Sequence, residues 1–265
     1  MDGAAAECGM DIERGTIGPL PYAAIGKGAP MLVIAGLMPY TGPGPDRMAR
    51  AAIGWITEAA DRRRFVLVNR RPGLPRGMTM ADIAAEHADA IRALGGRVDV
   101  MGTSTGGSIA QQLAADHPDV VGRLFLLSTA CRLGPEGKLL QRRVAARIRA
   151  GARRQATAVM VREFAPLPVA VAASLIGPLV MRGDRSWDDL AATIEAEDDF
   201  DLRRLDPIRA PTLVVCGRDD IFYPPELFEE TARLIPDSEL VILDDRGHID
   251  ALSDPRARAA ISRLL

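Results

Sequence analysis

The sequence predicts an α/β protein with a doubly wound, mostly parallel sheet and an inserted helical segment. Three observations predict this fold. Short apolar runs recur along the 265 residues, stretches with helical periodicity lie between them, and the alternation lapses once, from about residue 132. Alternating strands and helices are typical of a sheet that helices cover on both faces.

Six runs have the length of a strand. Each is almost continuously apolar, which is typical of strands buried on both faces of a parallel sheet. The runs are Met31–Ala35, Phe65–Asn69, Val98–Met101, Leu124–Ser128, Thr212–Cys216 and Glu239–Leu243. Between them, apolar residues recur at three- and four-residue steps in Thr79–Leu94 and Gly107–His117. This spacing predicts helices.

The alternation lapses between Arg132 and Asp206, where no convincing strand is found. Residues 132–162 hold nine lysines and arginines and one acid, whereas residues 184–206 hold nine acids and three arginines. We expect residues 132–206 to form an inserted helical domain between two parts of one core, 1–131 and 207–265. The simplest interpretation of the basic half is a solvated helix face that the acidic half balances. The alternative is a surface that guides anionic substrates or partners.

Composition and charge exclude several classes of protein. The chain has a net charge of −2 and only 4% aromatic residues, which disfavours binding to nucleic acid or to anionic membranes. The uncharged stretch 164–181 just reaches the length of a membrane span, but its three prolines would break the helix. The N-terminus lacks the features of a signal peptide. We therefore expect a cytoplasmic protein without a membrane span.

The stretch MGTSTGG at 101–107 sets Ser104 between a predicted strand and a predicted helix. A turn this sharp needs small residues two before and two after the serine, and Gly102 and Gly106 supply them. Such a turn raises the hydroxyl above the C-terminal edge of the sheet and aims a helix N-terminus at its surroundings. The pattern predicts a nucleophilic serine.

A serine nucleophile needs a base to take its proton, and the base needs a third group to orient it. His87 falls within a helical pattern and His117 at a helix end, so we expect structural roles for both. His248 follows the last predicted strand and is the candidate base. The loop after the strand at 212–216 offers the carboxylate, and its position there leaves Asp219 and Asp220 as alternatives.

An oxyanion intermediate needs two N–H donors placed in advance, each worth about 3 kcal/mol in the transition state. The N–H of Thr105, the first residue after Ser104, is one candidate. The second should come from the loop after the strand at 31–35, where we expect the N–H of Leu37, with Met38 as the alternative. A simpler interpretation is that Gly36 only turns the chain.

Four segments together resemble the α/β-hydrolase fold family over nearly the full chain: AGL at 35–37, GTSTGG at 102–107, PTLVVCGRDDIFYP at 211–224 and RGH at 246–248. The resemblance implies a core, a cap at 132–206 and a return to the core along residues 201–211. In this family the triad acid lies three residues after the glycine of the acid loop, which selects Asp220. The serine implies the branch without an aspartate nucleophile.

Two departures from the family pattern concern the loops around the site. Many relatives begin the oxyanion loop with His-Gly, and here Ala35 replaces the histidine, so a hydrogen bond that steadies the loop is missing or replaced. The segment NRRPG at 69–73 stands where relatives often have an aspartate and an Arg-Gly pair. The acid loop is similar to that of carbon–carbon hydrolases of aromatic ring cleavage, but the tryptophan common near their histidine is absent around His248.

These features predict a serine hydrolase of carboxylic esters, lactones or thioesters that forms an acyl-enzyme. The uncharged stretch 164–181 suggests a small-molecule substrate with an apolar acyl or aliphatic part. One alternative is a C–C bond hydrolase of a diketone or vinylogous keto acid. Another is a hydrolase-fold protein that binds a ligand without catalysis. Three scattered histidines, and the lack of a dinucleotide or phosphate-binding motif, predict neither a metal nor a cofactor.

Overall fold

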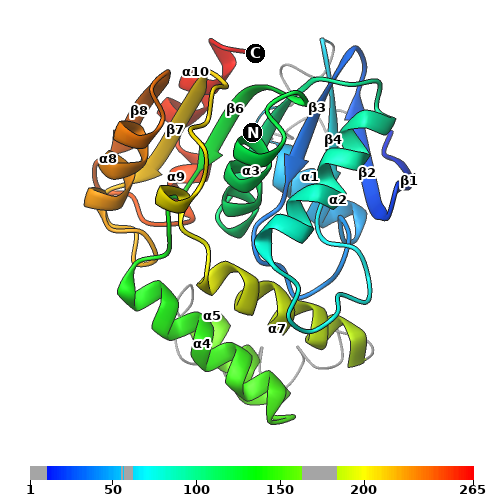
Figure 1. Cartoon of the computed structure of the whole chain (residues 1–265), viewed down its shortest axis with the longest axis vertical. Coiled ribbons are helices and arrows are strands. Elements are labelled where there is room, and N and C mark those ends of the chain that lie inside the picture. Colours follow the sequence, from blue (N-terminus) through cyan, green and yellow to red (C-terminus); the bar gives the residue numbers. More distant parts are fainter. Residues whose placement is uncertain (1–10, 55, 57–61, 163–183) are drawn as a thin grey trace, which may run out of the picture.

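An eight-stranded sheet forms the centre of the molecule, and helices lie on both of its faces (Figure 1). The computed structural model describes residues 11–54, 56, 62–162 and 184–265. The strand order is β1-β2-β4-β3-β5-β6-β7-β8, and the last six strands in this order are parallel. The predicted fold class is confirmed.

The six predicted strands make up the parallel part of the sheet. They are β3 (Ala29–Ile34), β4 (Arg63–Val68), β5 (Val98–Thr103), β6 (Val121–Leu127), β7 (Thr212–Gly217) and β8 (Ser238–Leu243). Every residue of β7 is buried, as a strand covered on both faces should be.

The sequence did not reveal the antiparallel hairpin at the other edge of the sheet. It consists of β1 (Glu13–Ile17) and β2 (Leu20–Gly26), and β2 pairs with β4. Four of the five residues of β1 are exposed and the fifth is half-buried, so this edge strand carries no apolar run. Gly18 makes the turn with φ 55°, a left-handed conformation that favours glycine.

Two layers of helices bury the two faces of the sheet. On one face lie α2 (Met80–Ala93), α3 (Thr105–Asp116) and α8 (Pro225–Leu234), and on the other lie α1 (Asp46–Ile53), α9 (Asp250–Ser253) and α10 (Pro255–Ser262). Side chains alternate along each strand, so that Ile34 enters the first core and Val33 the second. Both predicted helices are confirmed, although α3 begins at Thr105, two residues before the predicted start.

The strand order reverses direction at β3. Strands β4 and β5 lie on opposite sides of β3, so the chain winds in opposite directions from this point. The loops after β3 and β5 therefore diverge at the C-terminal edge, which is where ligands bind in open α/β sheets. The predicted oxyanion loop and the predicted nucleophile follow these two strands.

Three of the described helices lie beyond this edge, at the bottom of Figure 1: α4 (Pro135–Arg149), α5 (Arg153–Arg162) and α7 (Asp184–Asp198). They share a small core of their own, made of Val144, Ala145, Ile148, Ala156, Trp187, Leu190, Ala191 and Ile194. Arg142 pairs with Asp198 at 2.9 Å, and Arg149 pairs with Glu195 at 2.8 Å. The acids of α7 therefore neutralise the charges of these two arginines of α4.

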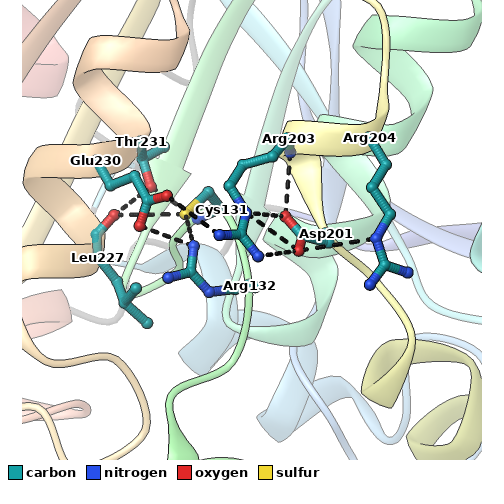
Figure 2. Close-up of polar contacts among 8 residues, drawn as sticks. All are labelled: Cys131, Arg132, Asp201, Arg203, Arg204, Leu227, Glu230 and Thr231. Atoms are coloured by element: carbon teal, nitrogen blue, oxygen red, sulfur yellow. Dashed lines mark hydrogen bonds and ion pairs between the residues drawn. The ribbon is translucent and has the colours of Figure 1, made fainter.

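The two connections between the sheet and these helices are fixed beside α8 (Figure 2). The Leu202 N–H, on the returning connection η2 (Leu202–Arg204), donates to the Cys131 carbonyl at 2.8 Å. The Cys131 N–H donates to Thr231 Oγ1 at 2.7 Å, and Arg132 pairs with Glu230 at 2.7 Å. The helical segment therefore leaves and rejoins the sheet at one fixed point.

The described helices do not include one with the length and apolar character of a membrane span. The uncharged stretch at 164–181 lies outside the described residues.

Candidate active site

The turn after β5 holds Ser104 in a conformation that few residues other than glycine adopt, with φ 53° and ψ −125°. Close packing enforces this turn. A Cβ atom on Gly102 would meet the Gly106 carbonyl, and one on Gly106 would meet the carbonyl of Ile34 in β3. The Ser104 N–H donates to the Leu127 carbonyl at 2.9 Å, which ties the turn to β6.

The structure brings Ser104, His248 and Asp220 together from the loops after β5, β8 and β7. His248 Nε2 lies 3.0 Å from Ser104 Oγ, and His248 Nδ1 lies 2.7 Å from Asp220 Oδ2. Asp219 is exposed, and its backbone N–H donates to the Arg246 carbonyl at 2.9 Å. With a proton on Nδ1 shared with the carboxylate, Nε2 presents its lone pair to the serine hydroxyl.

The Asp220 carboxylate is fixed by three hydrogen bonds. Its side chain is completely buried, and Oδ1 accepts the backbone N–H groups of Phe222 at 2.8 Å and Tyr223 at 3.1 Å. The second oxygen is left for the histidine. The loops that carry the acid and the histidine touch at Gly217, where a Cβ atom would meet the Arg246 carbonyl. This close approach explains the glycine three residues before the acid.

Aromatic rings and one hydroxyl group hold His248. Its ring lies 4.7 Å from the centroid of Phe222 and 6.0 Å from that of Tyr223, which is inclined by only 20°. Ser128 Oγ donates to the His248 carbonyl at 2.8 Å. Ser128 was not predicted from the sequence. The available signal was a small polar residue at the end of a buried strand, at the edge where the site forms.

The other two histidines lie on the helices that the sequence predicted. His87 is fully buried in α2, with Nδ1 2.7 Å from the Ile83 carbonyl, and burial lowers its pKa to about 4. His117 follows the last residue of α3.

The two predicted oxyanion donors flank the serine in different ways. Thr105 is the first residue of α3, where a backbone N–H has no partner within the helix. Gly36 in the loop after β3 lies against the serine, because a Cβ atom built on it would lie 3.3 Å from Ser104 Cβ. Leu37 follows, and its side chain packs against the core of α4, α5 and α7.

A buried arginine braces this loop. Arg70 Nη2 donates to the Met38 carbonyl at 2.7 Å, and the Arg70 N–H donates to Asn69 Oδ1 at 2.8 Å. Burial lowers the pKa of Arg70 to about 10, and the charge of Asp189 opposes this change. The NRRPG segment thus supplies a hydrogen bond to the loop in which Ala35 replaces the family histidine.

Within the described ranges, no group of three or more His, Cys, Asp or Glu side chains could hold a metal ion.

A comparison with protein families assigns the chain to one of them. The model of the alpha/beta hydrolase family matches residues 23–261. This chain belongs to that family.

Two curated relatives illustrate the chemistry found among hydrolases similar to this one. A pimeloyl-[acyl-carrier protein] methyl ester esterase of Neisseria meningitidis (strain MC58) is 32% identical over 191 residues, covering 69% of this chain and 74% of that protein. A 2-hydroxy-6-oxononadienedioate/2-hydroxy-6-oxononatrienedioate hydrolase of a Pseudomonas species is 25% identical over 270 residues, covering 90% and 89%. The chain is therefore an enzyme of the hydrolase class.

Solved structures agree on the fold. A thermophilic esterase from Thermogutta terrifontis superposes with a TM-score of 0.68 and 25% identity, covering 95% of this chain and 97% of the other. The hydrolase MGS-M2, from a deep-sea metagenome library of the Medee basin, gives a TM-score of 0.75 at 16% identity, with 94% and 95% covered.

Proposed function

We propose that this hydrolase cleaves carboxylic esters, lactones or thioesters through a Ser104–His248–Asp220 triad and an acyl-enzyme. One observation carries the proposal: the His248 ring bridges the serine hydroxyl at 3.0 Å and the buried carboxylate at 2.7 Å. The similarity to an esterase over 69% of the chain supports the same reaction class.

In the proposed mechanism, His248 Nε2 takes the proton of Ser104 as the hydroxyl oxygen attacks the acyl carbon. Asp220 fixes the tautomer of the ring and stabilises the imidazolium that forms. The imidazolium then gives its proton to the leaving oxygen or sulfur, and the acyl group stays on Ser104. In an ester or thioester the alcohol or thiol departs, whereas in a lactone the new hydroxyl stays on the acyl chain. A water molecule, deprotonated by the same nitrogen, releases the acid and restores the serine.

The negative charge of the tetrahedral intermediate falls on the former carbonyl oxygen. We assign its stabilisation to the N–H groups of Thr105 and Leu37, with Met38 as the alternative to Leu37. The free N–H at the start of α3 supports the first assignment, and the contact of Gly36 with Ser104 supports the second.

We further propose that residues 132–206 form a cap over a core made of residues 1–131 and 207–265. A groove of about 210 Å³ lies between α4 and the acid loop, lined by Leu139, Leu140, Ile221 and Phe222 together with the charged Glu136 and Arg143. We propose that its apolar part takes an aliphatic group. Phe222 also packs against the His248 ring, so the groove ends one side chain from the base.

A second candidate is hydrolysis of a C–C bond in a vinylogous keto acid. It is favoured by the similarity to the Pseudomonas hydrolase, which covers 90% of this chain. Parallel assays with a nitrophenyl ester and a 2-hydroxy-6-oxodienoate, followed by absorbance, separate the two candidates. The ester proposal requires the higher kcat/KM on the ester.

The decisive experiment measures turnover of nitrophenyl esters of graded chain length by the native enzyme and by Ser104→Ala. We expect turnover by the native enzyme and its loss in the variant. Equal hydrolysis by both, or by neither, contradicts the proposal. A fluorophosphonate probe should label the native enzyme and leave Ser104→Ala unlabelled, which also excludes a protein that only binds its ligand.

A further inference from the structure

A buried carboxylate from α7 reaches into the base of the candidate site. Glu197 is fully buried, and four side chains lie within hydrogen-bond distance of its two oxygens. Oε2 accepts from Thr105 Oγ1 at 2.7 Å and from Gln141 Nε2 at 2.9 Å. Oε1 accepts from Ser108 Oγ at 2.8 Å and from the Tyr223 hydroxyl at 3.2 Å.

These four partners are all neutral, and all of them can donate to an ionised carboxylate. Burial of a charge is costly unless partners such as these replace its water. The first turn of α3, which carries Thr105 and Ser108, also favours an anion beside it. Burial, followed by the charge of Glu197, raises the pKa of Tyr223, which keeps this hydroxyl protonated as a donor.

Two of the four partners also hold members of the triad. Thr105 follows Ser104 directly and carries a proposed oxyanion N–H. The Tyr223 N–H donates to Asp220 Oδ1 at 3.1 Å, and the Tyr223 ring stacks near the His248 ring. A single carboxylate thus contacts the neighbours of the nucleophile, the acid and the base.

The other contacts tie the carboxylate to the helices beyond the sheet. Glu197 lies in the last turn of α7, and Gln141 comes from the middle of α4. The arrangement of the turn at Ser104 and of the acid loop therefore depends on how α4 and α7 are seated against α3.

We propose that Glu197 is a positioning residue for the hydrolytic reaction. It acts through Thr105 on the oxyanion N–H and through Tyr223 on the His248–Asp220 pair, and it makes the reactivity of Ser104 depend on the seating of α7. This inference rests on the proposed function, because it assumes that Ser104 is the nucleophile. A purely structural role would stabilise the fold and leave the reactivity of Ser104 unchanged.

The test measures the second-order rate constant with which a fluorophosphonate labels Ser104, which requires no knowledge of the substrate. It compares the native enzyme with Glu197→Gln, Thr105→Val and the double variant, below the melting temperature of each. Glu195→Gln is the matched control, because Glu195 lies on the same helix and pairs instead with Arg149 in a partly exposed ion pair. Nitrophenyl ester kinetics supply kcat and KM for the same set.

We expect Glu197→Gln to lower the labelling rate and kcat about 10- to 100-fold, with KM changed less than about threefold, because a small displacement of reacting groups has effects of this size. Thr105→Val should also lower the labelling rate and kcat, but by a smaller factor. The double variant should be little slower than Glu197→Gln alone, since both changes break one contact. Glu195→Gln should label at the native rate.

A native labelling rate in Glu197→Gln, with only a lower melting temperature, overturns the inference. If Glu197→Gln does not fold, Thr105→Val decides, because it removes one hydroxyl and keeps the side-chain shape. Native labelling in a folded Thr105→Val would then refute the role. Failure of the native enzyme itself to be labelled contradicts the proposed function instead, so the two failures are distinguishable.

Discussion

Ser128 Oγ donates a hydrogen bond of 2.8 Å to the backbone carbonyl of His248. Ser128 follows β6 with φ 46°, in the left-handed region that costs a non-glycine residue about 1 kcal/mol or more. Ser128 is therefore strained and fully buried, and its hydroxyl fixes the loop of the proposed base. We interpret this contact as support for the position of His248.

Ser128→Ala should therefore impair the reaction as well as the fold. The His248 carbonyl loses its donor, which should lower the free energy of unfolding by about 1–3 kcal/mol. Loosening of the loop should lower kcat for a nitrophenyl ester about tenfold. Urea denaturation and steady-state kinetics measure the two effects.

The control is Ser238→Ala. Ser238 makes the same kind of bond, to the Ala232 carbonyl at 2.9 Å, at the start of β8. Its loss should alter stability and leave kcat at the native value. Equal kcat losses in both variants would show that the effect at Ser128 is general destabilisation.

The adjacent acids Asp219 and Asp220 form a matched pair for testing the orienting role. Asp220→Asn should lower kcat roughly 10³- to 10⁴-fold, because an amide at this position favours the wrong tautomer of the histidine. Asp219 is exposed, so Asp219→Asn should keep kcat within about twofold of the native value, as surface changes usually do. The reverse ranking of the two variants would move the acid role to Asp219.

Arg70 tests whether the brace on the predicted oxyanion loop matters for catalysis. Arg70→Met keeps the unbranched stem of the side chain and removes the guanidinium that donates to the Met38 carbonyl. A loop that moves should lower kcat about tenfold with little change in KM, because the oxyanion N–H acts mainly in the transition state. Steady-state kinetics on a nitrophenyl ester measure kcat and KM separately.

Arg71→Met is the neighbouring control. Arg71 pairs with Glu86 in a partly exposed ion pair, whose loss should cost less than about 1 kcal/mol of stability. If Arg70→Met and Arg71→Met have the same kinetics, the brace has no part in the reaction.

Much of the sheet and the turn at Ser104 could be predicted from the sequence, because both leave patterns among residues that are neighbours in the chain. The strands β3 to β7 are buried over most of their length, which leaves continuous apolar runs, and the turn at Ser104 needs glycines at fixed positions. The edge strand β8 is mostly half-buried and still carries an apolar run. The edge strand β1 is exposed and gives no such run, so the hairpin was missed.

The supporting contacts were not predictable, because they join residues far apart in the chain. Glu197 meets Thr105 only because α7 is seated against α3, and Ser128 meets His248 only because β6 and the loop after β8 share one edge. The nine acids at 184–206 give no sign that Asp189, Glu197 and Asp201 are buried. Tertiary packing alone distinguishes Glu197 from its neighbours.

His87 should make the stability of the protein depend on pH. Burial lowers its pKa from 6.5 to about 4. Between these values the unfolded chain binds a proton that the folded chain does not, so the free energy of unfolding falls as the pH falls, by about 3 kcal/mol for this group. Urea denaturation at pH 7 and pH 4 should show a smaller loss of unfolding free energy in His87→Gln than in the native enzyme. An equal loss in both proteins would mean that burial does not lower the pKa of His87.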